Sequence, residues 1–156
     1  MDQYQFVFLG LWLILSTIIF QSIIFIRAHR RTKGYKVGVM DSSLGQDSFL
    51  FRSYRTFWNS LENIVPFFGM SVIAVLSGYN AETLNIIVWI FAITRIIHML
   101  LYYFIATEKN PSVRSLFYII GFIANIYLMI DLGIYLVQWR YGEIFLNLKF
   151  EMDITL

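Results

Sequence analysis

The sequence predicts an all-α integral membrane protein, a four-helix up-and-down bundle. Its 156 residues are 58% hydrophobic and only 14% charged, and the mean hydropathy is +0.65, which is too apolar for an ordinary soluble domain. Four apolar segments each reach about the 20 residues that cross roughly 30 Å of hydrocarbon. Short connections between the last three segments favour antiparallel neighbours.

The predicted transmembrane domain covers residues 1–138, with helices near 6–26, 51–76, 84–105 and 112–137. The first helix is not expected to be a cleaved signal peptide, because only Asp2 precedes it and the basic run 27–31 follows it directly. Gly78 predicts the end of the second helix. The Asn110-Pro111 step predicts the boundary between the third and fourth helices.

The basic residues predict the orientation in the membrane. They gather at the first and third connections, as Arg27, Arg30, Arg31, Lys33, Lys36, Arg52, Arg55, Lys109 and Arg114, against Arg140 and Lys149 on the other side. The positive-inside tendency therefore places both connections in the cytosol and both termini on the opposite side. The membrane is expected to be a bacterial inner membrane or the endoplasmic reticulum, and no nucleic-acid partner is expected.

The sequence argues against cysteine-based sites and against metal sites. The chain contains no cysteine, which excludes a disulfide framework, a thiolate metal site and a catalytic cysteine. The two histidines, His29 and His98, lie at different predicted depths, and no other ligand cluster accompanies them. We therefore expect no metal.

The last residues show a different period. From Leu146 to Leu156 apolar and polar residues alternate strictly, which is typical of a strand. Residues 139–156 are therefore predicted to form an extended, strand-forming tail. Two interpretations stay open: the tail packs locally or lies at the membrane surface, or its free edge pairs with another copy or a partner.

Polar residues inside two neighbouring spans predict a site. Arg55, Asn59 and Glu62 share one face of the second helix, and Arg95, His98 and Tyr102 share one face of the third. A charge in a membrane span costs about 2.5–3.5 kcal/mol on insertion scales. Because Glu62 and Arg95 lie at matching depth, we predict a buried ion pair, which could be purely structural.

Further polar residues lie nearer the cytosolic surface. The fourth helix begins with Arg114, Ser115 and Tyr118, and the first ends in Arg27. Together these residues predict a basic pocket that opens to the cytosol. Arginines suit carboxylates, Glu62 suits an ammonium group and Asn59 suits an amide, so the pocket fits a small anionic peptide-like ligand. Its apolar walls suit a lipophilic second substrate from the bilayer.

The order of these motifs resembles the MAPEG superfamily, the membrane-associated proteins of eicosanoid and glutathione metabolism. The resemblance covers residues 25–137 approximately and rests on the patterns Arg55-x3-Asn59-x2-Glu62-Asn63-Ile64-x-Pro66-Phe67, Arg95-Ile96-x-His98-x3-Tyr102 and Arg114-Ser115. Residues 61–64 are similar to the microsomal glutathione transferase branch, whereas Arg114-Ser115 with Tyr118 is closer to microsomal prostaglandin E synthase. Phe57-Trp58 and the longer third connection depart from these relatives.

The resemblance implies a homotrimer that binds glutathione between subunits near the cytosolic face. It implies Arg114 and Ser115 as catalytic residues, with Arg114 stabilising the glutathione thiolate and Ser115 within hydrogen-bond reach of the sulfur. The implied glutathione contacts are Arg27, Arg55, Asn59, Glu62, His98, Tyr102 and Tyr118. Glutathione would be a co-substrate, and the implied chemistry needs no metal.

The predicted function is therefore a membrane glutathione transferase that adds the thiolate to lipophilic electrophiles in detoxification, with reduction of lipid hydroperoxides as an additional activity. Two alternatives stay open: a non-catalytic lipid-presenting protein of the same superfamily, and a small transporter subunit. Single residues also have plainer interpretations, since His98 could be a satisfied buried histidine and Tyr102 and Tyr118 could be interfacial aromatics.

Overall fold

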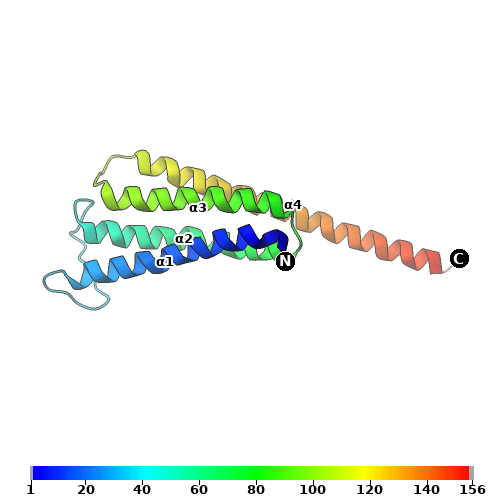
Figure 1. The fold of residues 1–156 in the computed structure, drawn as a ribbon, viewed down its shortest axis with the longest axis horizontal. Coiled ribbons are helices and arrows are strands. Elements are labelled where there is room, and N and C mark those ends of the chain that lie inside the picture. Colours follow the sequence, from blue (N-terminus) through cyan, green and yellow to red (C-terminus); the bar gives the residue numbers. More distant parts are fainter. Residues whose placement is uncertain (1, 155–156) are drawn as a thin grey trace.

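Four long helices make up the computed structural model, which describes residues 2–154 and the side chains of residues 2–138. After a short 3-10 helix, η1 (Asp2–Tyr4), come α1 (Gln5–Arg30), α2 (Phe49–Leu76), α3 (Ala81–Phe104) and α4 (Val113–Ile154) (Figure 1). Each predicted helix is confirmed, and no strand occurs in the described part of the chain. All four helices are long and apolar enough to cross a membrane.

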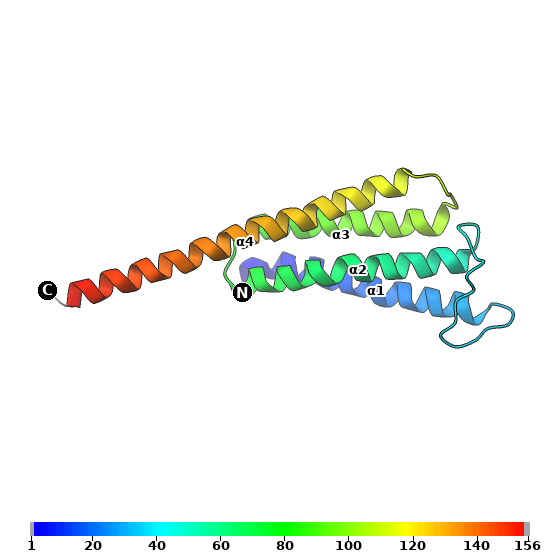
Figure 2. The ribbon, with the colours of Figure 1, turned by 180° about the vertical axis from the view of Figure 1, so that it is seen from behind.

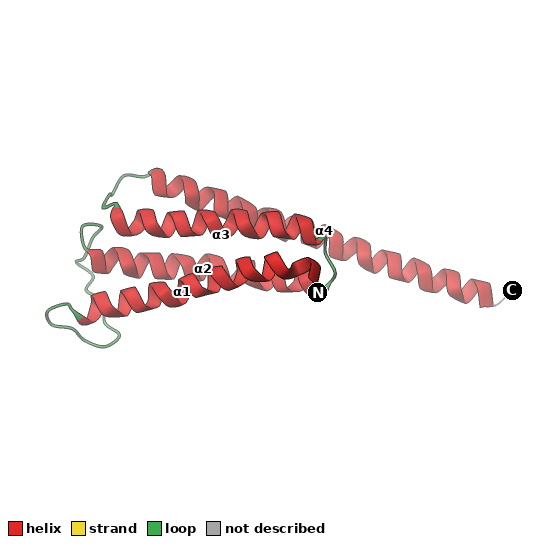
Figure 3. Ribbon diagram, in the orientation of Figure 1, coloured by secondary structure: helices red, strands yellow, loops and turns green. Residues whose placement is uncertain are grey.

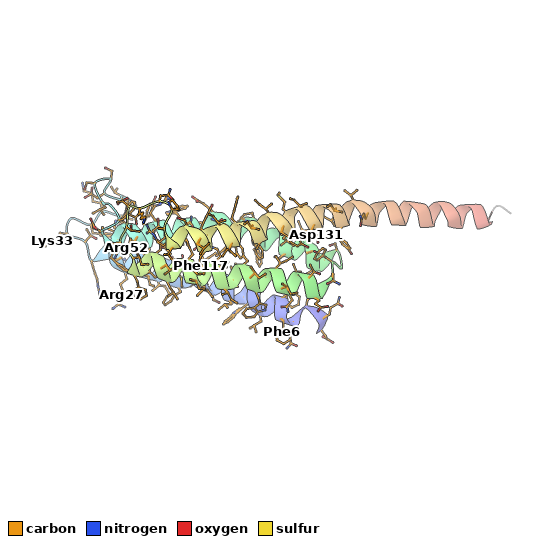
Figure 4. The ribbon with its side chains drawn as sticks, turned by 90° about the horizontal axis from the view of Figure 1, so that it is seen from above. Phe6, Arg27, Lys33, Arg52, Phe117 and Asp131 are labelled. Carbon is orange, nitrogen blue, oxygen red and sulfur yellow. The ribbon has the colours of Figure 1, made fainter. Side chains whose placement is uncertain are left out.

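The helices run antiparallel in chain order, with α1 beside α2 and α3 beside α4 (Figures 1 and 2). The two longer connections, residues 31–48 and 105–112, therefore lie at the same end of the bundle, and the N-terminus lies at the other end (Figure 3). Figure 4 places Arg27, Lys33 and Arg52 towards the first end and Phe6 towards the second. We call these the loop end and the N-terminal end.

Local chemistry sets where the helices begin and end. The Ser48 and Asn80 side chains accept hydrogen bonds from the backbone N–H groups of Phe51 and Thr83 and so cap α2 and α3. Gly78 follows α2 with φ +75°, and the Tyr79 N–H then bonds back to the Ala74 carbonyl at 2.9 Å. This is a Schellman closure, and it confirms Gly78 as the stop signal.

An apolar core fills the middle of the bundle. Phe67 of α2 stacks on Phe91 of α3 with ring centroids 3.8 Å apart, and both side chains are fully buried, as are Val88 and Leu128 beside them. Large apolar side chains also cover the outside, such as Phe6, Trp12 and Ile19, each at least 64% exposed. An apolar exterior around a close-packed interior is what a bilayer requires of a spanning bundle.

The predicted extended tail is wrong as far as the structure describes it. Residues 139–154 belong to α4, which continues past the bundle at the N-terminal end (Figure 1); residues 155–156 lie outside the described part. A lone strand would leave its backbone groups without partners, whereas a helix satisfies them within itself. Extending an existing helix also avoids the cost of nucleation. The two-residue alternation of side chains therefore does not determine the backbone conformation of this segment.

A hydrogen-bonded cluster ties the helices together at the N-terminal end. The Tyr4 hydroxyl donates to the Tyr79 carbonyl, and the Tyr79 hydroxyl donates to the Asp131 carboxylate. The Tyr135 hydroxyl donates to the Ser77 carbonyl at 2.9 Å. Burial, then the hydrogen bond to Asp131, raise the pKa of Tyr79 above its usual range, so this phenol stays a donor. Asp131 thus has a structural partner far from the loop end.

Candidate functional site

A polar cavity of about 500 Å³ lies at the loop end, between α2, α3, the start of α4 and the two longer connections. Six of the nine predicted site residues line it: Asn59, His98, Tyr102, Arg114, Ser115 and Tyr118. Its volume falls within the roughly 300–1,000 Å³ that is typical of small-molecule sites. The fold therefore brings residues from three helices together at the end where the basic residues gather.

Arg114 is the strongest cationic feature of this cavity. It lies in the first turn of α4, and its side chain is only 6% exposed. Nη2 donates to the Thr107 carbonyl at 2.6 Å and Nη1 to the Gln46 Oε1 at 3.1 Å. The guanidinium carbon also lies 4.2 Å from the centre of the Tyr102 ring, a favourable cation–π contact.

The charge of Arg114 is not neutralised within the described residues. Its hydrogen-bond acceptors are the neutral carbonyl groups of Thr107, Ile105 and Gln46, and its buried Nε has no partner there. A buried cation normally pairs with an anion, because leaving water is costly for a charge. The cavity therefore presents a fixed positive charge that an anionic ligand would satisfy.

Ser115 follows Arg114 in the same first turn. Its Oγ accepts a hydrogen bond from the Ser112 N–H at 3.1 Å, so the hydroxyl hydrogen can still point to another acceptor. The start of α4 adds helix N–H groups and the positive end of the helix dipole, which also favour an anion. Pro111 disfavours a helical conformation at Asn110, and α4 begins just after it at Val113, so Arg114 and Ser115 lie in its first turn.

Aromatic and imidazole groups also line the cavity. The His98 ring lies 5.4 Å from the Tyr102 ring and 6.0 Å from the Tyr118 ring, centre to centre. His98 is only 3% exposed, and its Nδ1 has no hydrogen-bond partner within residues 2–138. This nitrogen is therefore available to bond to water or to a ligand.

The predicted ion pair between Glu62 and Arg95 is not formed within the part of the chain that the structure describes. Arg95 is 3% exposed, and its Nη2 donates to the Asn59 Oδ1 at 2.6 Å and weakly to the Ser60 Oγ at 3.5 Å. Glu62 is exposed. The rotation of α2 about its axis makes Ser60 and Asn63 face inwards and Glu62 face outwards.

Three of the predicted contacts do not line this cavity. Arg55 and Glu62 sit on the exposed face of α2, one turn either side of Asn59. Arg27 is exposed on α1 and lines a separate small groove with Arg31 and Phe49. The predicted sharing of one face by Arg55, Asn59 and Glu62 holds, but that face points mostly away from the bundle and only Asn59 reaches the cavity.

Gln46 is a cavity residue that the sequence did not single out. It belongs to the connection before α2, and its side chain contacts Arg114 and Tyr102, which lie 68 and 56 residues further along the chain. Arg52 Nη1 donates to its carbonyl at 2.5 Å. Only chain folding brings these groups together, so no local pattern marks the residue.

Metal-binding clusters are not a feature of the described residues, which contain no group of three or more His, Asp or Glu side chains that could hold an ion. The cavity is lined by the cations of Arg114 and Lys109, the carboxylate of Glu108, and several hydroxyl, amide and imidazole groups. Two cations and many neutral hydrogen-bonding groups against one carboxylate suit an organic anion.

Comparison with known proteins assigns the family. No curated protein and no solved structure was found to match the chain. The profile of the MAPEG family matches residues 6–134, which covers most of each of the four spans and every residue of the cavity. Because the match covers most of the chain, this protein belongs to the MAPEG family and is an integral, multi-pass membrane protein.

Proposed function

We propose that this protein is a glutathione-dependent transferase of the microsomal glutathione transferase and prostaglandin E synthase type. The observation that carries the proposal is the buried, un-neutralised guanidinium of Arg114 at the mouth of a cavity of about 500 Å³. Family membership is consistent with a glutathione-related function in a membrane. Glutathione supplies both an acidic peptide for the arginine and a thiol that a neighbouring cation activates.

The chemistry follows from thiol acidity. A free thiol has a pKa of about 8.5 and is mostly protonated at neutral pH, whereas a guanidinium nearby favours the thiolate. The thiol proton then leaves to water at the cavity mouth. The thiolate sulfur forms a bond to the electrophilic carbon, and a leaving group such as chloride departs with its electron pair. Ser115 would donate a hydrogen bond to the same sulfur.

The other cavity residues would hold the peptide. The amide of Asn59 would pair with a peptide amide, and His98, Tyr102 and Tyr118 would supply further hydrogen bonds and ring contacts. We propose that the loop end faces the cytosol, as the basic residues favour, and that the lipophilic electrophile enters from the bilayer. Peroxidase activity on lipid hydroperoxides would use the same thiolate.

Titration of the purified protein with glutathione tests this proposal. Wild-type protein is expected to develop the ultraviolet absorbance of a bound thiolate near neutral pH and to turn over a chlorodinitrobenzene-type electrophile. S-methyl glutathione, which has no ionisable thiol, is the control and should bind without the absorbance. Wild-type protein that neither binds glutathione nor forms thiolate would overturn the proposal.

We further propose a homotrimer, because three expected contacts lie on outward surfaces. A carboxylate such as Glu62 is costly against lipid, and a neighbouring subunit would cover it. In such an assembly Arg55 and Glu62, together with Arg27 of α1, would face the cavity of an adjacent subunit and complete the glutathione site.

Cysteine cross-linking tests the assembly, and the chain has no native cysteine to interfere. Val65 lies on the same face of α2 as Glu62 and is 59% exposed, whereas Ile123 on α4 is 58% exposed. Val65→Cys is expected to give covalent dimers on oxidation in membranes, and the equally exposed Ile123→Cys is expected to give far fewer. Equal yields from the two variants would contradict α2 as the contact face.

A second candidate, a non-catalytic lipid-binding protein, is favoured by a separate apolar groove. This groove has a volume of about 450 Å³ between α3 and α4, and isoleucines such as Ile86, Ile90 and Ile123 line it. It fits a hydrocarbon chain but carries no reactive group. The glutathione titration separates the two candidates, since lipid presentation needs no thiolate.

A transporter subunit is disfavoured by the packing below the cavity. The stacked rings of Phe67 and Phe91, with Ile64 and Leu128, are at most 1% exposed. They separate the polar groups at the loop end from Asp131 at the N-terminal end. A site open on one side is suited to catalysis rather than to conduction.

A further inference from the structure

Gln46 connects four groups around the cavity mouth. Its Oε1 accepts from Arg114 Nη1 at 3.1 Å, and its Nε2 lies 3.5 Å from the Tyr102 hydroxyl. Its backbone N–H donates to the Glu108 Oε1 at 3.2 Å, and its carbonyl accepts from Arg52. The side chain is half-buried.

The position of Gln46 affects the charge balance of the site. Glu108 and Arg114 both line the cavity and are the opposite charges that could pair across its mouth. Gln46 stands between them, because its backbone binds the carboxylate while its side chain binds the guanidinium. The side chain that accepts a hydrogen bond from Arg114 is therefore a neutral amide, and the positive charge of Arg114 is left for a ligand.

The amide also fixes a direction of hydrogen bonding. Since its oxygen faces Arg114, its NH₂ group must face the Tyr102 oxygen. A phenol oxygen that accepts there keeps its own hydrogen free, and the Tyr102 hydroxyl can then donate into the cavity. Both effects of Gln46 make the mouth more attractive to an anion.

We propose that Gln46 is a positioning residue that holds Arg114 in place without neutralising it, and so sets the preference of the site for a thiolate over a thiol. This role rests on the proposed glutathione function. A carboxylate at the same position would form a charge-assisted pair with Arg114 and would occupy the cation that the thiolate needs.

Three substitutions test the role. Gln46→Glu has nearly the same shape and adds only the charge, and it is expected to raise the pH midpoint of thiolate formation by about one unit or more. Gln46→Met keeps the volume without a charge or an acceptor. Because Arg114 then loses one charged hydrogen bond but keeps its full charge, Gln46→Met should raise the midpoint clearly less than Gln46→Glu does, and it should weaken glutathione binding about 3- to 10-fold. Gln138→Glu, an exposed site at the other end of the bundle, controls for net charge.

The measurements are the pH dependence of thiolate absorbance and glutathione affinity, with size-exclusion chromatography to check folding. A Gln46→Glu midpoint equal to that of wild type would overturn the role of Gln46 while leaving the transferase function standing. An equal shift in Gln46→Met would assign the effect to loop structure and would also overturn it. Wild-type protein without thiolate would remove both proposals together.

Discussion

Replacing Arg114 by alanine is expected to abolish the thiolate absorbance at neutral pH and to lower turnover about 100- to 1,000-fold, the usual cost of removing one buried group that stabilises reacting charge. The physical reason is that Arg114 is the most buried cation lining the cavity, at 6% exposure, and its contacts within the described residues are all to neutral groups. Without it, the bound thiol would titrate about one to three pH units higher.

Lys109→Ala is the matched control, because Lys109 lines the same cavity but is exposed to solvent. Its removal takes away one cation that water already screens, so thiolate formation should change little. Arg114→Lys keeps the charge but loses the forked donors that reach Thr107 and Gln46 together; partial thiolate formation is expected. Retention of full thiolate formation by Arg114→Ala would show that another group activates the sulfur.

A large loss of stability is expected for Asn59→Leu. The Asn59 Oδ1 is the closest acceptor of the buried Arg95 guanidinium, at 2.6 Å, while two other nitrogens of Arg95 have no partner within the described residues. Removing this acceptor leaves a charge in low dielectric with only the weak contact to Ser60. The expected cost is about 3 kcal/mol, seen as a lower midpoint of thermal unfolding in detergent micelles.

The double variant Asn59→Leu/Arg95→Met identifies the cause. Arg95→Met removes the charge that Asn59 stabilises by its hydrogen bond. The double variant should therefore be more stable than Asn59→Leu alone, and such a coupling is seen only between residues that interact. Asn85→Leu is the control, since Asn85 is a similarly half-buried asparagine of α3 whose Oδ1 accepts no hydrogen bond in the described structure. Strictly additive losses in the double variant would contradict the coupling between Asn59 and Arg95.

The spans were predictable because hydrophobic length is a local property of the chain. All four predicted helices agree with the structure to within a few residues at their first ends, and Gly78 ends α2 as expected because few other residues adopt φ +75° without strain. The helical conformation of residues 139–154 was not predictable from their apolar–polar alternation. A period of two is weak evidence for a strand where no partner strand exists.

The depth of the polar residues along their helices was predictable, but their pairing was not. Depth along a helix follows from residue number, and Asn59, His98 and Tyr102, which were expected near the cytosolic surface, do line one cavity. Rotation of α2 about its axis depends on how its whole face packs against α1 and α3. That packing turned Asn59 towards Arg95 and Glu62 away, which no spacing rule within α2 could have shown.

The sequence by itself determined the class of the protein: the number and length of its spans, the basic end, and the set of polar residues at that end, because these depend on composition and local period. The tertiary structure alone decided which of those residues share a cavity, that Asn59 rather than Glu62 serves Arg95, and that Gln46 separates Arg114 from Glu108. Those relations join residues from 36 to 68 positions apart, and only the packing of helices and loops fixes the distances between such groups.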